Sequence, residues 1–227
     1  MFTTGRPIRR TDATPAGLLR LDAVARYLQD AAEDDVDDSG LREPYDWRLR
    51  RCALTIRGYP RRGQWLRLAT FCSATGPRWA ERTTTLSAAG TELIQARAVW
   101  VAVDRATGQS CPVGPEFHRR YGPAAQGRRV SARLSHPPPS PSASPRGWPL
   151  RAADFDAADH VGNTVHWQAA EDVLAGLGWR PARAEMEYHH PILRGDQLRL
   201  ACQLSAGRAD VWLLNDSARL ASAQLTR

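Results

Sequence analysis

One stretch of the chain occurs twice, and this duplication constrains the fold more than any other feature. Asp154–Gln168 (DFDAADHVGNTVHWQ) aligns without gaps on Asp12–Arg26 (DATPAGLLRLDAVAR). Three polar residues of the later copy fall on apolar or uncharged residues of the earlier one: Asp156 on Thr14, His160 on Leu18 and Asn163 on Leu21. Each copy leads into a helical stretch that strand-like sequence follows. The pattern predicts a duplicated domain in which the second copy carries the chemistry and the first is mostly scaffold.

The length and the cysteines limit the class of protein. At 227 residues the chain has room for one large domain or two small ones with a real hydrophobic core. No run approaches the ~18 apolar residues that span a bilayer. No apolar stretch follows the arginines of MFTTGRPIRR, which argues against a secretory signal. The four cysteines show neither CxxC spacing nor a His-rich neighbourhood, so we expect no metal site and a reduced, cytoplasmic protein.

The basic charge is carried by arginine alone. The net charge is +7 and the chain contains no lysine, a bias that a GC-rich genome produces without a functional cause. A basic surface can still steer an acidic macromolecule toward the protein. Nucleic acid is the weaker candidate, because the arginines are scattered and no helix-turn-helix, zinc-finger or aromatic RNP signature is present. We therefore expect neither a nucleic-acid nor a membrane partner.

A proline-rich segment divides the chain. His136–Pro149 (HPPPSPSASPRGWP) contains too many prolines for a helix or a central strand and favours extended backbone. We place an N-terminal domain at residues 1–135, a linker at 136–149 and a C-terminal domain at 150–227. The preceding Tyr121–Arg129, rich in Gly, Ala and Arg, is typical of a surface loop.

Both domains show one helix followed by strands. In the first, Leu21–Glu33 has apolar residues at helical spacing, and the acidic run Glu33–Asp38 with Gly40 closes the helix. The strand-like segments that follow are Leu49–Arg57, Gln64–Ala74, Trp79–Ser87 and Leu93–Asp104. In the second, Asn163–Leu177 is the helix. The strand-like segments after it are Arg183–His189, Gln197–Ser205, Asp210–Leu214 and Ala218–Thr226. This order predicts an α+β fold in which each helix packs on an antiparallel sheet.

The motif Asp-x-Asp-x-x-x-His-Val-x-Asn at Asp154–Asn163 resembles that of the hotdog-fold thioesterases. The two-copy layout resembles the acyl-ACP thioesterase family. Arg26–Ala32 (RYLQDAA) is similar to the RYLQEAA helix start of its bacterial members. Glu187-Tyr188 with Arg194–Asp196 is similar to its EYR…GD strand and turn. The similarity covers most of Thr11–Leu225. It implies a tandem hotdog, two copies of a long helix wrapped by an antiparallel sheet, whose sheets pair into a pseudo-dimer.

The resemblance carries the family's working residues over in part. Its catalytic Asp falls on Asp156 and its catalytic His on His160, while the aromatic residue usual on the hotdog helix falls on His166. Three other family residues are replaced: the Asn by Ala158, the later acidic residue by Pro191 and the Cys beside it by Ile192. Aspartates before a helix are also common N-caps. Capping is the alternative role of Asp156, and capping or solvent exposure is the expected role of Asp154 and Asp159.

Thioester hydrolysis needs a base or nucleophile, a donor for the oxyanion and a channel for the acyl chain. Asp156 lies before the helix, where its carboxylate could activate water or attack the carbonyl carbon. The backbone N–H groups around Val161 and Gly162 could hold the thioester oxygen. His160 could orient Asp156 or share the proton transfer, and Asn163 could position water or the carbonyl.

Further residues complete the predicted site. His189, or its neighbour His190, replaces the missing acidic group if the strand lies beside the helix, and only one of the two can face it. His166 is either a substrate contact or a satisfied, half-buried helix residue. Trp65 and Trp100 are expected to pack in the core of the first domain. In the resembled family that half shapes the acyl pocket, so one of these tryptophans could contact the acyl chain and set its length.

The resemblance implies hydrolysis of an acyl thioester, with an acyl carrier protein as the donor. No cofactor is expected beyond water and the pantetheine arm of the substrate. The acidic surface of a carrier protein suits a basic docking face. Three alternatives stay open: a non-catalytic acyl-binding protein, because polar positions are replaced; a thioesterase acting on acyl-CoA; and a hotdog dehydratase or hydratase. The tandem chain could also form a homodimer.

Overall fold

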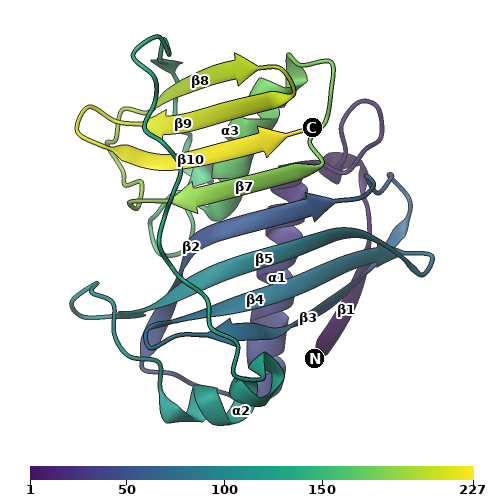
Figure 1. The fold of residues 1–227 in the computed structure, drawn as a ribbon, viewed down its shortest axis with the longest axis vertical. Coiled ribbons are helices and arrows are strands. Elements are labelled where there is room, and N and C mark those ends of the chain that lie inside the picture. Colours follow the sequence, from purple (N-terminus) through teal and green to yellow (C-terminus); the bar gives the residue numbers. More distant parts are fainter.

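A single ten-stranded antiparallel sheet runs through the computed structural model, which describes all 227 residues (Figure 1). The first half of the chain supplies β1 (Phe2–Pro7), β2 (Tyr45–Ile56), β3 (Trp65–Thr75), β4 (Trp79–Ala88) and β5 (Thr91–Asp104). The second half supplies β6 (Arg146–Gly147), β7 (Arg183–Tyr188), β8 (Arg199–Ser205), β9 (Arg208–Leu214) and β10 (Arg219–Thr226). The order along the sheet is β1-β3-β4-β5-β2-β7-β10-β9-β8-β6, so the strands of each half stay together.

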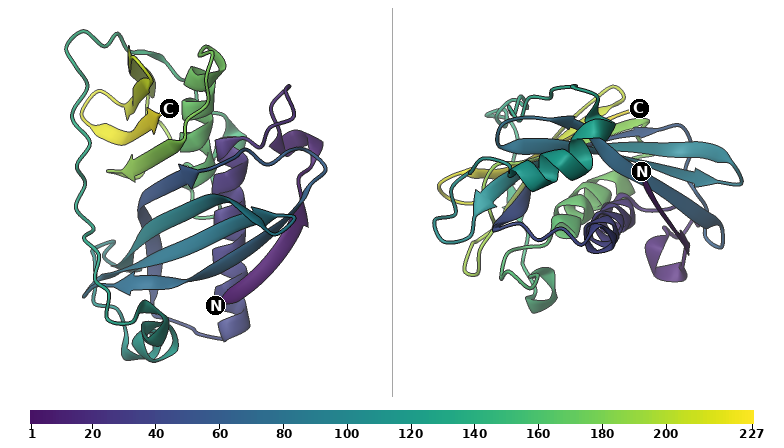
Figure 2. Two further views of the ribbon diagram at one scale, coloured as in Figure 1. Left: turned by 45° about the vertical axis from the view of Figure 1, so that its right-hand side comes forward. Right: turned by 90° about the horizontal axis from the view of Figure 1, so that it is seen from below.

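Two helices cover one face of this sheet. α1 (Leu21–Ser39) and α3 (Asn163–Ala175) lie side by side, and α2 (Pro115–Ala125) packs against β3 (Figure 2). α1 buries residues that recur every three to four positions and therefore share one helical face: Leu21, Val24, Leu28 and Ala31. None of the helices has the length and apolar character that a membrane span requires.

The two halves join at β2 and β7. These strands pair antiparallel from Arg51–Glu187 to Thr55–Arg183. One hydrophobic core of 38 buried residues contains side chains of both helices and of strands from both halves. The chain is therefore a tandem hotdog whose two sheets pair into a pseudo-dimer, as the resemblance implied.

The duplication seen in the sequence recurs in the backbone at the same shift in residue number. Asp12 and Asp154 each end a 3-10 turn, at Arg10–Asp12 and Ala152–Asp154. Each is 4% exposed and accepts the backbone N–H three residues earlier at 2.8 Å. Antiparallel bridges follow at equivalent positions, Ala13–Leu19 and Phe155–Val161. Asp12–Arg26 and Asp154–Gln168, which align without gaps in sequence, therefore also have equivalent backbone structures.

α1 is longer than predicted. The acidic run that was expected to close it lies within the helix, which ends at Gly40 in a left-handed conformation (φ 66°). The physical reason is tertiary. Asp35 is buried and accepts a hydrogen bond of 2.6 Å from Arg82 of β4, while its backbone oxygen accepts one from Tyr121 of α2. These contacts hold the last turns of the helix.

The elements β1 and α2 were not predicted. α2 occupies part of the segment expected to be a surface loop, Tyr121–Arg129. It starts at Pro115, a residue that is tolerated in the first helical turn. Phe117 and Tyr121, one turn apart, are buried against the sheet.

After α2 the chain crosses the sheet on the face opposite α1 and α3 (Figures 1 and 2). The Arg51 guanidinium donates to the backbone oxygens of Arg133 and Ser131 at 3.1 and 3.2 Å. The indole N–H of Trp212 donates to the oxygen of Pro137 at 3.0 Å. The proline-rich segment is thus attached along the outer face of the sheet, and within it Arg146–Gly147 adds the short edge strand β6 beside β8.

Candidate active site

The motif residues form a closed loop immediately before α3. The N–H of Asp156 donates to the oxygen of His160 at 2.8 Å. Asp156 Oδ1 accepts the N–H groups of Ala158 and His160 at 2.9 and 3.2 Å. Asp156 is exposed, and its Oδ2 has no partner within the chain. One carboxylate oxygen therefore shapes the loop, while the other is available to a substrate or a water molecule.

The first copy keeps this loop without the acid. The N–H of Thr14 donates to the oxygen of Leu18 at 2.8 Å, and Thr14 Oγ1 accepts the Leu18 N–H at 3.2 Å. The neutral hydroxyl of Thr14 thus accepts the same loop N–H that Asp156 Oδ1 accepts in the second copy. A carboxylate is not needed to form this loop, so the negative charge of Asp156 has a role other than holding the loop.

The N-terminus of α3 presents free backbone donors, but not the predicted ones. The N–H of Val161 donates to the oxygen of Ile192 at 3.0 Å, and the N–H of Gly162 donates to the oxygen of Asp154 at 2.9 Å. Both predicted oxyanion donors are therefore already bonded. The N–H groups of Asn163 and Thr164, in the first turn after the Gly162 N-cap, have no partner within the chain.

At the equivalent end of α1 the first backbone donor is already bonded. The N–H of Leu21, which matches Asn163 in the alignment, donates to Glu171 Oε1 of α3 at 2.6 Å. Glu171 is in turn held by Arg180 at 2.7 Å. At the open end, the Asn163 amide donates to Gln29 Oε1 of α1 at 3.3 Å. The two helix starts therefore differ at this first donor, which is bonded in α1 and free in α3.

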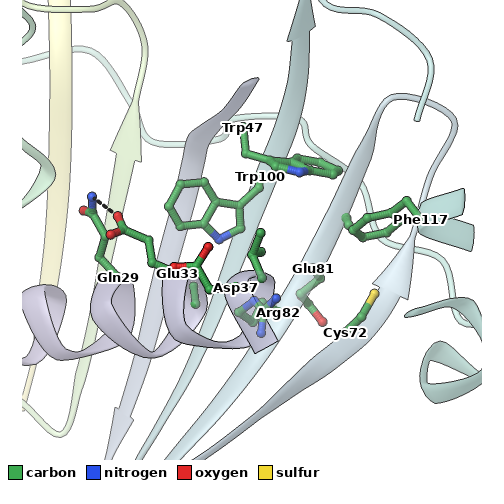
Figure 3. Close-up of a pocket in the computed structure, with 12 residues that line it drawn as sticks. Gln29, Glu33, Asp37, Trp47, Cys72, Glu81, Arg82, Trp100 and Phe117 are labelled. Atoms are coloured by element: carbon green, nitrogen blue, oxygen red, sulfur yellow. Dashed lines mark hydrogen bonds between the residues drawn. The ribbon is translucent and has the colours of Figure 1, made fainter. Parts of the chain in front are cut away.

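A cavity of about 430 Å³ lies between α1 and the sheet (Figure 3). Gln29, the residue that contacts Asn163, lies at its margin. One face of α1 forms one wall, and the sheet and α2 form the rest. Its other lining residues are Ala32, Glu33, Val36, Asp37, Trp47, Cys72, Ala80, Glu81, Arg82, Trp100 and Phe117. The lining is mostly apolar, which suits a hydrocarbon chain.

Comparison with known proteins places the chain in a family. The model of the acyl-ACP thioesterase N-terminal domain matches residues 1–121. The chain belongs to the acyl-ACP thioesterase family. An uncharacterized protein of Mycobacterium tuberculosis is 26% identical over 203 residues, which cover 88% of this chain and 81% of that protein.

Two solved structures share the tandem fold of this acyl-ACP thioesterase family member. The 12:0-ACP thioesterase from Umbellularia californica superposes with a TM-score of 0.85 at 18% identity. An acyl-ACP thioesterase from Bacteroides thetaiotaomicron superposes with a TM-score of 0.83 at 17% identity. Each similarity covers 99% of this chain and 96% of the other. The likeness extends through both halves and the linker.

The two predicted tryptophans lie in different environments. Trp100 lines the cavity, and its buried indole N–H has no hydrogen-bond partner. Trp65 is 62% exposed at the start of β3, where it lies against Gly5 of β1. The expectation that Trp65 packs in the core is wrong, because the alternation along β3 turns Leu66 and Leu68 into the core and Trp65 to the exposed face, where it does not line the cavity.

His166 is a satisfied buried residue. It is 4% exposed, its Nδ1–H donates to the oxygen of Gly162 at 3.2 Å, and its ring packs edge-on against Tyr188 at 4.9 Å. Burial lowers the pKa of His166 to about 4, because the imidazolium would lose its hydration. It therefore stays neutral and supports the turn that carries Gly162, and it lines none of the described cavities.

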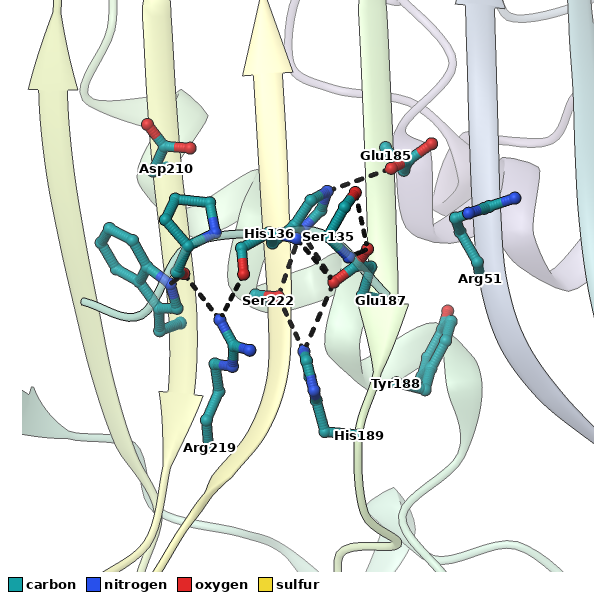
Figure 4. A network of polar contacts seen from close by, with 12 residues as sticks. Arg51, Ser135, His136, Glu185, Glu187, Tyr188, His189, Asp210, Arg219 and Ser222 are labelled. Atoms are coloured by element: carbon teal, nitrogen blue, oxygen red, sulfur yellow. Dashed lines mark hydrogen bonds and ion pairs between the residues drawn. The ribbon is translucent and has the colours of Figure 1, made fainter. Parts of the chain in front are cut away.

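His189 lies on the wrong face of the sheet for the predicted role. Met186 and Tyr188 of β7 face the helices, so Glu187 and His189 face outward. His189 Nε2 lies 3.1 Å from Ser222 Oγ on that outer face (Figure 4). His190 is exposed. The structure does not bring His189 to the motif, and it leaves the replaced acidic position of this family member unfilled.

The other motif aspartates have structural contacts, and two contributors were missed. Asp154 accepts from the backbone and guanidinium of Arg151, and the exposed Asp159 pairs with Arg194. Gln29 and the N–H of Thr164 were not predicted. Gln29 had a signal in the sequence, since it aligns with Glu171 at the same shift as the motif.

Proposed function

We propose that this acyl thioester hydrolase works at the N-terminus of α3. Asp156 is the general base or nucleophile, with His160 beside it in the loop. The observation that carries the assignment is the start of α3. The N–H groups of Asn163 and Thr164 are free, and one oxygen of Asp156 in the preceding loop has no partner. Gln29, which contacts the Asn163 side chain, lines an apolar cavity. At the equivalent positions of the first copy, Thr14 replaces the carboxylate and the Leu21 N–H is bonded to Glu171.

The arrangement fits addition of water to a thioester carbonyl. The N–H groups of Asn163 and Thr164, with the positive end of the helix dipole, stabilise the oxyanion that develops in the transition state. Asp156 takes a proton from the attacking water as the C–O bond forms. The C–S bond then breaks, and the thiolate leaves with that proton. If Asp156 attacks directly, water hydrolyses the resulting anhydride with the same products.

The acyl chain is assigned to the apolar cavity rather than to the larger groove of about 1070 Å³ near the N-terminus of α1. Charged side chains line that groove and are already paired with one another: Arg20 with Asp22, Arg146 with Asp172 and Arg180 with Glu171. A hydrocarbon chain gains free energy by leaving water for apolar surroundings. The cavity of Figure 3 offers such surroundings.

An acyl carrier protein is the proposed donor. The net charge of +7 favours association with an acidic partner. The name of the structurally similar Umbellularia californica enzyme states that it is a 12:0-ACP thioesterase. Acyl-CoA is the alternative donor, since its phosphates would be attracted by the same arginines.

A non-catalytic acyl-binding protein remains the second candidate, because three family positions are replaced. Two of the replacements are accommodated by the backbone. The N–H of Ala158 donates to Asp156 Oδ1, and the oxygen of Ile192 accepts from Val161. The loop is thus held without those side chains.

Release of free acid from a panel of acyl-ACP and acyl-CoA thioesters tests the proposal. Asp156→Ala and His160→Ala are compared with Thr14→Ala, the matched change in the first-copy loop. We expect a loss of at least ~100-fold in kcat for Asp156→Ala and less than ~3-fold for Thr14→Ala. Saturable ligand binding without turnover in the wild type would assign the acyl-binding role instead. The better donor distinguishes ACP from CoA.

A further inference from the structure

One arginine contacts the motif loop on both sides of Asp156. Arg194 lies in the turn Ile192–Asp196, between β7 and β8. Its guanidinium forms an ion pair with Asp159 and lies 4.4 Å from the centroid of the Phe155 ring, which is a cation–π contact. Phe155 comes directly before Asp156, and Asp159 comes three residues after it. The Arg194 side chain therefore joins the two arms of the loop.

The tip of this loop has no other attachment to the fold. Residues 156–159 are all exposed, so packing does not hold them. Their hydrogen bonds join them to one another or to His160 at the end of the tip. The ion pair of Asp159 with Arg194 is the one polar contact between the tip and the rest of the chain. The orientation of Asp156 therefore depends on Arg194.

The turn that carries Arg194 has a counterpart in the first half of the chain, Pro60–Gln64. In each turn the backbone oxygen of the first residue accepts the N–H at the end of the neighbouring loop, at 2.8 Å in the first half and 3.0 Å in the second. The side chain of the last residue accepts the N–H three residues before it, at 2.7 and 2.8 Å. Each turn also has a glycine in the left-handed conformation at its fourth residue. Arg62 is therefore the first-half equivalent of Arg194.

The two halves differ in the partner that the loop offers to this arginine. Asp159 matches Gly17 in the alignment of the loops, and both residues are left-handed, with φ of 59° and 78°. Glycine adopts this conformation without strain, whereas aspartate tolerates it less well. Gly17 has no carboxylate for Arg62, but Asp159 pairs with Arg194. The second copy thus has an ion pair where the first has unstrained backbone.

We propose that Arg194 and Asp159 are positioning residues, which fix the loop so that the free carboxylate oxygen of Asp156 points to the thioester at the start of α3. The inference rests on the proposed function, in which Asp156 is the base or nucleophile. Folding stability does not account for the pair, because its side chains are 59% and 61% exposed and exposed ion pairs contribute little to stability. Strained backbone that stability does not explain occurs mainly at functional sites.

Asp159→Gly tests the proposal, because it restores the residue of the first copy and relieves the left-handed strain. The Tm of this variant should therefore be no lower than that of the wild type. We expect kcat for release of free acid to fall ~10-fold, with KM within ~2-fold, because the cavity for the acyl chain is unchanged.

Arg194→Ala should cause the same loss of kcat as Asp159→Gly. The double variant should lose no more than either single variant, because the two residues act as a pair. Arg62→Ala, the matched change in the first half, should keep the kcat of the wild type.

NMR order parameters of the Ala158 and His160 amides measure the loop without any need for turnover. Both amides donate to Asp156 Oδ1, and in the wild type they should be as rigid as ordered backbone, with S² about 0.85. In Arg194→Ala, which introduces no glycine, we expect S² below about 0.6. Arg62→Ala should match the wild type.

The two readouts separate this proposal from the proposed function. If the wild type releases no acid from any thioester, the proposed function fails, and the order parameters decide the role of the pair: a mobile loop in Arg194→Ala supports it and a rigid one overturns it. If Asp159→Gly and Arg194→Ala keep both the kcat and the order parameters of the wild type, the pair has no positioning role. A loss of kcat that accompanies an equal loss of thermal stability in both variants would make the pair a part of the fold, and it would also overturn the proposal.

Discussion

Gln29 and Glu171 occupy equivalent positions on α1 and α3, and each reaches the N-terminus of the other helix. Glu171 Oε1 accepts the backbone N–H of Leu21 at 2.6 Å and so occupies the first donor of α1. Gln29 Oε1 accepts only the side-chain N–H of Asn163, at 3.3 Å, and leaves the backbone donors of α3 free. Together with the replacement of Asp156 by Thr14 in the first copy, this difference explains why we assign one active site to the chain and not two.

Gln29→Ala should impair turnover without unfolding the protein. The change removes the acceptor that positions Asn163 beside the oxyanion donors, and we expect kcat to fall about 10-fold, the size of a lost positioning contact. Gln29 is partly exposed, so the free energy of unfolding should change by less than about 1 kcal/mol. Steady-state kinetics with parallel urea unfolding would measure both. An unchanged kcat would place the reacting carbonyl elsewhere.

Glu171→Ala should have the opposite profile. The change removes a carboxylate that pairs with Arg180 and accepts the Leu21 N–H, and the side chains of the pair are only 12% and 22% exposed. Leaving Arg180 without its partner should lower the free energy of unfolding by about 2–3 kcal/mol. We expect kcat at 25 °C to stay within ~3-fold of the wild type. A larger loss of kcat would show that both helix ends take part in the reaction.

Asp35→Ala should destabilise the C-terminal turns of α1. Asp35 and Arg82 form a nearly buried pair at 2.6 Å, and removal of one partner leaves the other charge uncompensated, at about 3 kcal/mol. Asp38→Ala, on the exposed side of the same helix, is the matched control and should change stability by less than about 0.5 kcal/mol. Chemical unfolding of both variants checks this. Equal effects would mean that the acidic run acts through helix propensity alone.

The ion pair of Asp35 and Arg82 shows why the sequence predicted the start of α1 but not its end. The apolar stripe of α1 is visible in the sequence, and it predicted the start of the helix at Leu21 correctly. Its end depends on Arg82, a residue on a strand that spacing alone does not connect with Asp35. α2, in contrast, could have been predicted from the sequence, because Phe117 and Tyr121 are apolar residues one helical turn apart. We predicted a surface loop there because of the neighbouring Gly, Ala and Arg residues.

In the candidate site, too, the sequence predicted the local features but not the contacts between distant parts of the chain. The gapless repeat located the loop of Asp156 and the start of α3, because both copies keep the same local hydrogen bonds. The outward position of His189 was also implied by the sequence. In the alternation of β7, Met186 and Tyr188 are the apolar residues, so the core face excludes His189. The bonded state of Val161 depends on Ile192, a contact across the fold that no local pattern contains.

Trp100→Ala should shift the substrate preference toward longer acyl chains. Trp100 lines the cavity, and removal of its indole leaves space for additional methylenes, each worth up to about fourfold in kcat/KM from ~0.8 kcal/mol of burial. Trp65→Ala is the matched control, because Trp65 is exposed and lies outside the cavity. A series of acyl-ACP substrates of increasing length measures the shift. The same shift in Trp65→Ala, or none in Trp100→Ala, would contradict the placement of the chain.

His166 should make the stability of the protein depend on pH in the acidic range. Its pKa is about 4 in the folded state and 6.5 in its ordinary state, so the unfolded chain binds a proton first as the pH falls. The free energy of unfolding contributed by neutral His166 is therefore complete above pH ~6.5 and falls by about 3 kcal/mol as the pH approaches 4. His166→Phe keeps a ring at this position but cannot titrate. Urea unfolding of both proteins between pH 7 and 4 isolates the effect, because all other groups are common to both. The wild type should lose stability more steeply than His166→Phe, and parallel curves would show that His166 is already accessible to protons in the folded protein.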